Sequence, residues 1–326
     1  MLEQQIQHID LTLPRGWNQC TTEQLELIAA CIIKHTLEQN RYHPFDWLEV
    51  KAELFFLLTE VEVVSEENDP VDGDPEYQHH AYICRKGGTE FPIYIWQVFS
   101  FIEQHLAWID DPKAKPLIIF PYKQLLSEWR LSRRFPFIKK HWLAPGELLQ
   151  DFSWREYRFL QDYMELYVSL QNQMAKLQQQ GTADKDRLAD LARQMLDARN
   201  NFLAVLFKAE GKSSARTKDA CKARIFNLQS SIFNDIRWQV ILFWWSGMMH
   251  YLQQQFPHCF KQSKGKSTKR PPLPIELYRN IITTVQKESN GLTEDEVNAQ
   301  TFYIVLEHLE RLAKQAEEME KLNRKH

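Results

Sequence analysis

Glycine is scarce in this chain, at 10 of 326 residues, which is about half of the roughly 7% that average proteins contain. Sheet-rich folds need glycine in hairpin turns and bulges, because those positions require backbone angles that other residues avoid. The scarcity therefore favours helices. Hydrophobic residues make up 44% of the chain, enough to bury a core in one large or two ordinary domains. We expect a mainly α fold with a body built as a bundle of several helices.

Helix starts are signalled by capping boxes, in which Ser or Thr stands three positions before Gln or Glu and each side chain bonds the other's backbone. Three such pairs precede apolar residues at helical spacing: Thr21 with Gln24, Ser153 with Glu156, and Thr293 with Glu296. These capping boxes, together with apolar residues at helical spacing elsewhere in the chain, predict helices over about 21–38, 153–180, 184–206, 221–255, 275–289 and 293–323.

The segment 60–76 interrupts this helical pattern. It contains eight acidic residues, two prolines and a glycine but no basic residue, which is typical of a solvated loop. A short β-hairpin is predicted near 82–95, where β-favouring runs flank Gly87-Gly88. Pro92 restricts its strand to an edge or to a strand start.

Composition shifts suggest where the chain divides. Residues 1–260 are expected to form the helical main body, with a possible inner boundary near 110–150, where prolines cluster. Residues 261–274 are basic and contain three prolines, as a linker would. Residues 275–326 then form a C-terminal helical pair.

The last predicted helix has an apolar seam that could bind a partner. Its spacing alternates between three and four residues, which is the a/d pattern of a coiled coil over less than three heptads. An intramolecular core face explains the seam equally well. The predicted contact residues are Phe302, Val305, Leu309, Leu312 and Met319.

Two basic segments raise the alternative of a nucleic-acid-associated module. Residues 129–142 interleave positive charge with aromatic side chains, a pattern that single-stranded nucleic acids exploit, and residues 261–270 could neutralise phosphates. A net charge of −3 gives no overall electrostatic footprint for such a role, so nucleic acid is the less favoured partner. The residues concerned are Arg130, Arg133, Arg134, Lys264, Lys266, Lys269 and Arg270.

Catalytic and metal-binding motifs are not recognisable. The sequence has no phosphate-binding glycine loop, GxSxG or HExxH pattern, so we assign no catalytic residue, cofactor or metal. His79-His80 with Cys84, and His250 with His258 and Cys259, lack neighbouring residues that would complete a tetrahedral zinc site. An enzyme of unfamiliar type would need converging polar groups in a pocket.

Targeting signals are not visible either. The N-terminus lacks a basic region followed by an apolar run. The most apolar stretch, residues 240–249, is shorter than the roughly 20 residues of a membrane span. Five scattered cysteines fit reduced thiols. We expect a cytoplasmic protein that does not enter a membrane.

Four phrases of the sequence resemble phage and prophage proteins that take part in tail morphogenesis. They are Leu13-Pro-Arg-Gly-Trp17-Asn18 ahead of Thr22-Glu-Gln-Leu25, the helical region from Tyr157 to Tyr167, Leu203-Ala-Val-Leu-Phe207, and Phe243-Trp-Trp-Ser-Gly247 through Phe256-Pro257-His-Cys-Phe260. The resemblance implies a non-enzymatic, chaperone-like assembly factor whose helical surfaces hold another protein. It supplies no functional residues for transfer. Together with the seam, it predicts binding to another protein or self-association through helical faces.

Overall fold

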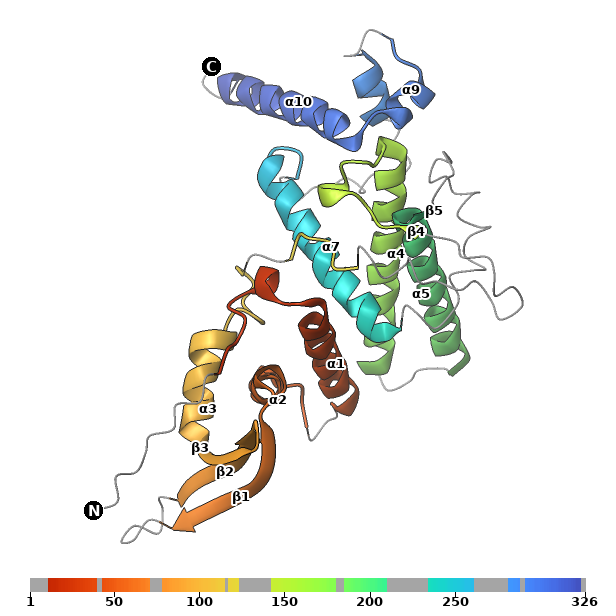
Figure 1. The fold of residues 1–326 in the computed structure, drawn as a ribbon. Helices are drawn as coiled ribbons and strands as arrows, with labels where there is room; N and C mark the ends of the chain where they lie inside the picture. Colours follow the sequence, from red (N-terminus) through yellow and green to blue (C-terminus); the bar gives the residue numbers. More distant parts are fainter. Residues whose placement is uncertain are drawn as a thin grey trace. The chain divides into compact units, whose positions relative to one another are not determined.

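Two compact units make up the chain, and each consists of two separate stretches of sequence. Unit 1 contains residues 1–121 and 233–247, and unit 2 contains residues 122–232 and 248–326. The computed structural model (Figure 1) describes residues 11–39, 43–70, 78–114, 117–122, 142–179, 185–209, 234–260, 281–287 and 291–323. The fold is mainly α, as the glycine scarcity predicts. The predicted linker over 261–274 lies outside the described residues, and the C-terminal residues 275–326 belong to unit 2.

Unit 1 is built around two helices that follow each other in the sequence and pack together. After the short turn η1 (Trp17–Gln19), α1 spans Thr22–Glu38 and α2 spans Trp47–Thr59. The predicted capping box starts α1: Gln24 N donates to Thr21 Oγ1 at 3.2 Å and Thr21 N donates to Gln24 Oε1 at 3.0 Å. Apolar side chains on both helices, including Ile28, Leu54 and Phe55, are fully buried.

A three-stranded antiparallel sheet lies beside these helices in the order β1-β2-β3, with β1 spanning Glu62–Pro70 (Figure 1). Strands β2 (Gln78–Lys86) and β3 (Thr89–Tyr94) form the predicted hairpin. Its turn uses Gly87 and Gly88, whose φ angles of 57° and 83° are left-handed and suit glycine. Pro92 lies on β3, an edge strand, as expected. A helical segment follows, formed by α3 (Ile95–Phe101) and the π-helical turn η2 (Ile102–Leu106).

The prediction of a loop over 60–76 was wrong for its first part, because β1 spans Glu62–Pro70 and pairs with β2. Residues 62–67 are all exposed, so the acidic side chains meet water while the backbone supplies the strand's hydrogen bonds. Arg85 of β2 offsets part of their charge, since it contacts Glu62 at 3.4 Å on one side and Glu90 of β3 on the other. Opposite charges across neighbouring strands stabilise such a sheet.

Helix α7 (Asp235–Gln255) contributes to both units, with residues up to Gly247 in unit 1 and residues from Met248 in unit 2. In unit 1 its aromatic side chains complete the core. Phe243 packs on Trp17 with ring centroids 4.8 Å apart, and Trp244 packs edge-on against Phe120 at 5.0 Å. The indole of Trp244 also donates to the carbonyl oxygen of Ile118 at 3.1 Å. The predicted earlier start of this helix, over 221–233, lies outside the described residues.

Unit 2 contains a long pair of helices, α4 (Trp154–Gln179) and α5 (Lys185–Leu206), that lie side by side (Figure 1). The predicted Ser153–Glu156 capping box starts α4, with Ser153 N donating to Glu156 Oε2 at 2.8 Å. The turn η3 (Glu147–Leu149) precedes α4. The short strands β4 (Trp142–Leu143) and β5 (Lys208–Ala209) pair with each other.

The predicted single helix over 293–323 is two helices, α9 (Glu294–Ala299) and α10 (Phe302–Asn323). Thr293 and Glu296 form their capping box as expected, but the helix stops at Ala299. The break arises because the backbone at 300–302 pairs with the backbone at 152–154. Gln300 O accepts from Trp154 N at 2.7 Å, and Phe302 N donates to Phe152 O at 3.2 Å. Residues 281–287 are also helical.

Candidate functional site

The first turns of α10 belong to the core of unit 2. Phe302 and Val305 are both fully buried, and the Phe302 ring stacks on Tyr157 of α4 with centroids 4.6 Å apart and planes 13° apart. Beside it, the Tyr303 hydroxyl donates to the carbonyl oxygen of Leu148 at 2.8 Å. Phe302 and Val305, two members of the predicted seam, are therefore covered by their own chain.

The middle of α10 is held by polar contacts to the turn that follows α7. The carboxylate of Glu310 accepts from the backbone N–H groups of His258, at 3.0 and 3.1 Å, and Cys259, at 2.8 Å. Two turns further along α10, Glu317 lies 3.2 Å from Nδ1 of His258. Hydrogen bonds between a carboxylate and backbone N–H groups are among the stronger ones in proteins, so this carboxylate fixes α10 on unit 2.

The far end of α10 presents apolar side chains to solvent. Leu309 and Leu312 are half-buried, whereas Met319 and Leu322 are 59% and 55% exposed. The five predicted contact residues thus divide into two buried, two intermediate and one open. We call the stretch formed by Leu309, Leu312, Met319 and Leu322 the α10 seam. Leu322 was not among the predicted residues, because it lies outside the strict a/d spacing.

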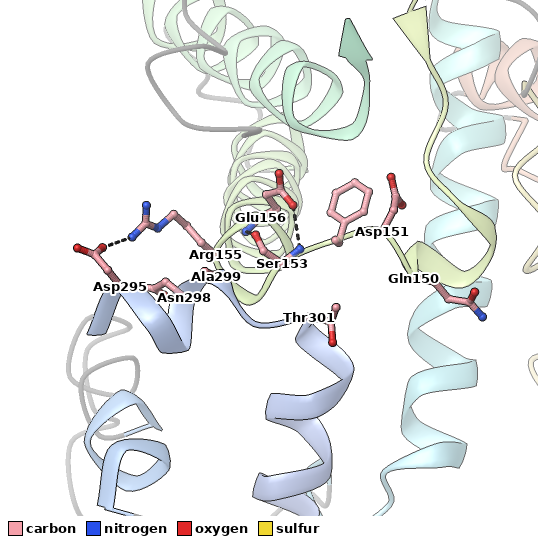
Figure 2. Close-up of a pocket in the computed structure, with 10 residues that line it drawn as sticks. Gln150, Asp151, Ser153, Arg155, Glu156, Asp295, Asn298, Ala299 and Thr301 are labelled. Carbon is pink, nitrogen blue, oxygen red and sulfur yellow. Dashed lines mark hydrogen bonds and ion pairs between the residues drawn. The ribbon is translucent and has the colours of Figure 1, made fainter. Parts of the chain in front are cut away.

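A cavity of about 620 Å³ lies where α4, α9 and α10 begin. Figure 2 shows Ser153, Arg155 and Glu156 at the start of α4, opposite Asp295, Asn298 and Ala299 of α9. Gln150, Asp151, Phe152 and Thr301 complete the lining.

The ionisable groups of this cavity are engaged in structural contacts. Arg155 pairs with Asp295 at 2.6 Å, Glu156 caps α4 through Ser153, and Asp151 Oδ1 accepts from Gly146 N at 2.8 Å. The ten described residues that line the cavity include no histidine, cysteine or lysine, and nucleophilic catalysis usually needs such a group next to its nucleophile. The Arg155–Asp295 pair connects the start of α4 to α9.

The residues of the alternative nucleic-acid prediction lie outside the described part of the chain. This holds for Arg130, Arg133 and Arg134 in the first basic segment. It holds equally for the basic residues of the second segment, which are Lys264, Lys266, Lys269 and Arg270.

Three of the four histidines weighed as metal ligands, His80, His250 and His258, contact other side chains in the structure. His80 lies 3.6 Å from Glu66, His250 bonds Gln254 at 2.8 Å, and His258 contacts Glu310 and Glu317. Among the described residues, the ligand atoms that do come together belong to Cys31, His35 and Glu53 in unit 1. Sequence reasoning missed this group. Its only local signal is the four-residue spacing of Cys31 and His35, since Glu53 comes from the next helix.

Comparison of the chain with protein-family models, curated proteins and solved structures finds no match. Within the described residues, none of the helices has the length and apolar character that crossing a membrane requires.

Proposed function

We propose that this chain is a non-enzymatic assembly factor that holds a helix of another protein, or of a second copy, against the α10 seam. The main support is that the apolar side chains of α10 continue at three- and four-residue spacing beyond the part of the helix that is buried in unit 2. Phe302 and Val305 are fully buried in unit 2, while Met319 on the same helix is 59% exposed. Apolar side chains repeated at this spacing pack well against a second helix.

The strength of such binding can be bounded from the side chains involved. Burying a Leu or Met side chain contributes about 1.5–3 kcal/mol. Association costs roughly 4–15 kcal/mol in lost freedom of movement. Met319 and Leu322 alone do not offset that cost, so the half-buried Leu309 and Leu312 must also take part. The seam therefore supports weak, reversible binding, as a transient assembly factor requires.

The resemblance to tail-morphogenesis proteins suggests the class of partner. In that reading the chain is a cytoplasmic, chaperone-like factor that holds an apolar helix of a phage or prophage tail protein until assembly covers it. No bond is made or broken in this role, and the cavity at the start of α4 serves only to join helices.

Photo-crosslinking from the helix surface tests the proposal directly. A photoreactive amino acid at Met319 should give a discrete crosslinked species in cells that produce the full chain together with its native neighbours. The same residue at Lys321, which is exposed and lies two residues from Met319 on the other side of α10, serves as the control. A product of twice the chain mass would identify a second copy as the partner, and another mass would identify a different protein.

Equal crosslinking from positions 319 and 321, or none from either, would contradict the proposal. A matched pair of variants gives a second readout. Met319→Lys with Leu322→Lys should abolish the crosslink from a probe at Leu312. Glu307→Lys adds the same charge at an exposed position two residues before Leu309, away from Leu312 and Met319, and should leave that crosslink intact.

A further inference from the structure

Helices α1 and α2 bring together a sulfur, a nitrogen and an oxygen ligand that lie far apart in sequence. Cys31 and His35 are four residues apart on α1 and so project from the same face of that helix. Glu53 lies on α2. The Cys31 Sγ, a His35 ring nitrogen and a Glu53 carboxylate oxygen all lie within 4.8 Å of one another.

The surroundings of these atoms are partly closed to water. Cys31 is 3% exposed, and the side chains of His35 and Glu53 are 13% and 31% exposed. His35 Nε2 lies 2.8 Å from Glu53 Oε2, and Cys31 Sγ donates to the Val50 carbonyl oxygen at 3.7 Å. Lys34 pairs with Glu53 from the solvent side at 2.9 Å.

A second carboxylate lies next to the other nitrogen of the histidine. Glu49 Oε2 is 3.9 Å from His35 Nδ1, and His43 Nε2 is 3.3 Å from the same oxygen. Histidines that bind metals commonly donate their second ring N–H to a carboxylate, which fixes the ring orientation and makes the ligand more basic. Glu49 therefore lies where such an orienting group is expected.

We infer that Cys31, His35 and Glu53 form a binding site for a divalent transition metal of the zinc class, with Glu49 orienting His35. Thiolate, imidazole and carboxylate are the groups that zinc prefers. A tetrahedral site leaves the fourth position to water. Ideal zinc distances of about 2.0–2.3 Å place ligand atoms roughly 3.5 Å apart, so the 2.8 Å contact between His35 Nε2 and Glu53 Oε2 must open and any spacing near the 4.8 Å limit must close. The Glu53 side chain, which reaches the group from α2, can supply that movement.

Charge balance favours this occupancy. The Cys31 thiol carries a proton, since its Sγ donates to the Val50 carbonyl oxygen at 3.7 Å. A divalent ion lets the thiol release that proton to solvent. The resulting thiolate and the Glu53 carboxylate together neutralise the two positive charges.

Cobalt(II) titration of the full chain under reducing conditions tests the site, because cobalt replaces zinc and reports its ligands by absorption. We expect a thiolate-to-cobalt charge-transfer band, together with the intense visible bands of tetrahedral cobalt, saturating at one ion per chain and reversed by zinc. Cys31→Ser should abolish the charge-transfer band. Cys20→Ser, which removes another partly buried thiol of unit 1, should retain it.

Two further measurements keep the inference testable if Cys31→Ser does not fold. Zinc should raise the thermal unfolding midpoint of the wild-type chain, and Glu53→Gln should remove that rise. Glu49→Gln should weaken cobalt binding by about 10–100-fold while keeping the band shape. Absence of a charge-transfer band in the wild-type chain, or a band that persists in folded Cys31→Ser, would overturn the inference and reduce the group to an ion-pair network.

Discussion

Ser153 and Thr301 pair in an antiparallel β-bridge, and each residue immediately precedes the first residue of a helix, α4 for Ser153 and α10 for Thr301. The bonds on either side of the bridge run from Trp154 N to Gln300 O and from Phe302 N to Phe152 O. Backbone groups at helix starts otherwise lack intrahelical partners. One short contact therefore satisfies groups at two helix starts and fixes where both helices begin.

Replacing Ser153 with Ala should lower the free energy of unfolding by about 1 kcal/mol, the usual cost of losing a helix cap. The Ser153 hydroxyl accepts from Glu156 N at 3.3 Å in the capping box. Urea unfolding followed by circular dichroism measures the loss. Ser246→Ala, an exposed change inside α7, is the matched control and should cost nothing. An equal effect of both variants would contradict the capping role.

The two ends of α10 should differ sharply when truncated. Phe302→Ala should cost about 3–5 kcal/mol, because it leaves a cavity in a packed core. Met319→Ala should change stability by less than about 0.5 kcal/mol, as surface changes usually do. Chemical unfolding of both variants makes the comparison. A large loss from Met319→Ala would mean that the seam is already covered within the isolated chain.

The contribution of Glu53 to stability should depend on pH. Burial acts to raise the pKa of Glu53, but hydrogen bonds from Lys34 and His35 outweigh it, so that pKa is lowered. A carboxylate with a lowered folded pKa stabilises the protein above its unfolded pKa, near 4.5, and that stability is lost as the pH falls through the folded value.

Glu53→Gln should therefore cost about 0.5–1 kcal/mol at pH 7, given the partial exposure of the group. The difference from wild type should shrink as the pH falls below about 4.5. Metal-free urea unfolding over a pH series measures this. A difference that stays constant from pH 7 to pH 3 would show that the pairing contributes through shape instead of charge.

Buried thiols should resist alkylation in the native state. Burial raises the pKa of Cys84 to about 11 and that of Cys31 to about 12, and only the thiolate reacts. Iodoacetamide at pH 8, followed by peptide mass spectrometry, should modify Cys31 and Cys84 slowly in buffer and completely in urea. Rapid labelling of Cys84 in buffer would indicate that the sheet opens frequently.

Local signals in the sequence predicted three helix starts correctly. The capping boxes at Thr21, Ser153 and Thr293 all form, because their bonds join residues three positions apart. The Gly87-Gly88 turn was predicted for the same reason. Its backbone angles are a property of the glycines themselves.

Contacts between distant segments could not be predicted in this way. β1 has the composition of a loop and becomes a strand through pairing with β2. Neither Gln300 nor Thr301 is a helix-breaking residue. The helix ends there because the backbone groups of Phe152 and Trp154 form hydrogen bonds with those of Phe302 and Gln300. Glu53 joins Cys31 and His35 only because α1 and α2 pack together. In each case the missing information is which segments meet.

The interleaving of the two units along the chain has a consequence for synthesis. Trp17 and Phe120 pack on Phe243 and Trp244, which the ribosome adds only after all of residues 122–232. At about 5–20 residues per second, the nascent first half waits on the order of 10 s with those aromatic surfaces uncovered. The emerging polypeptide is thus a target for general chaperones throughout that interval. Cutting the gene after codon 121 would leave it permanently in that incomplete state.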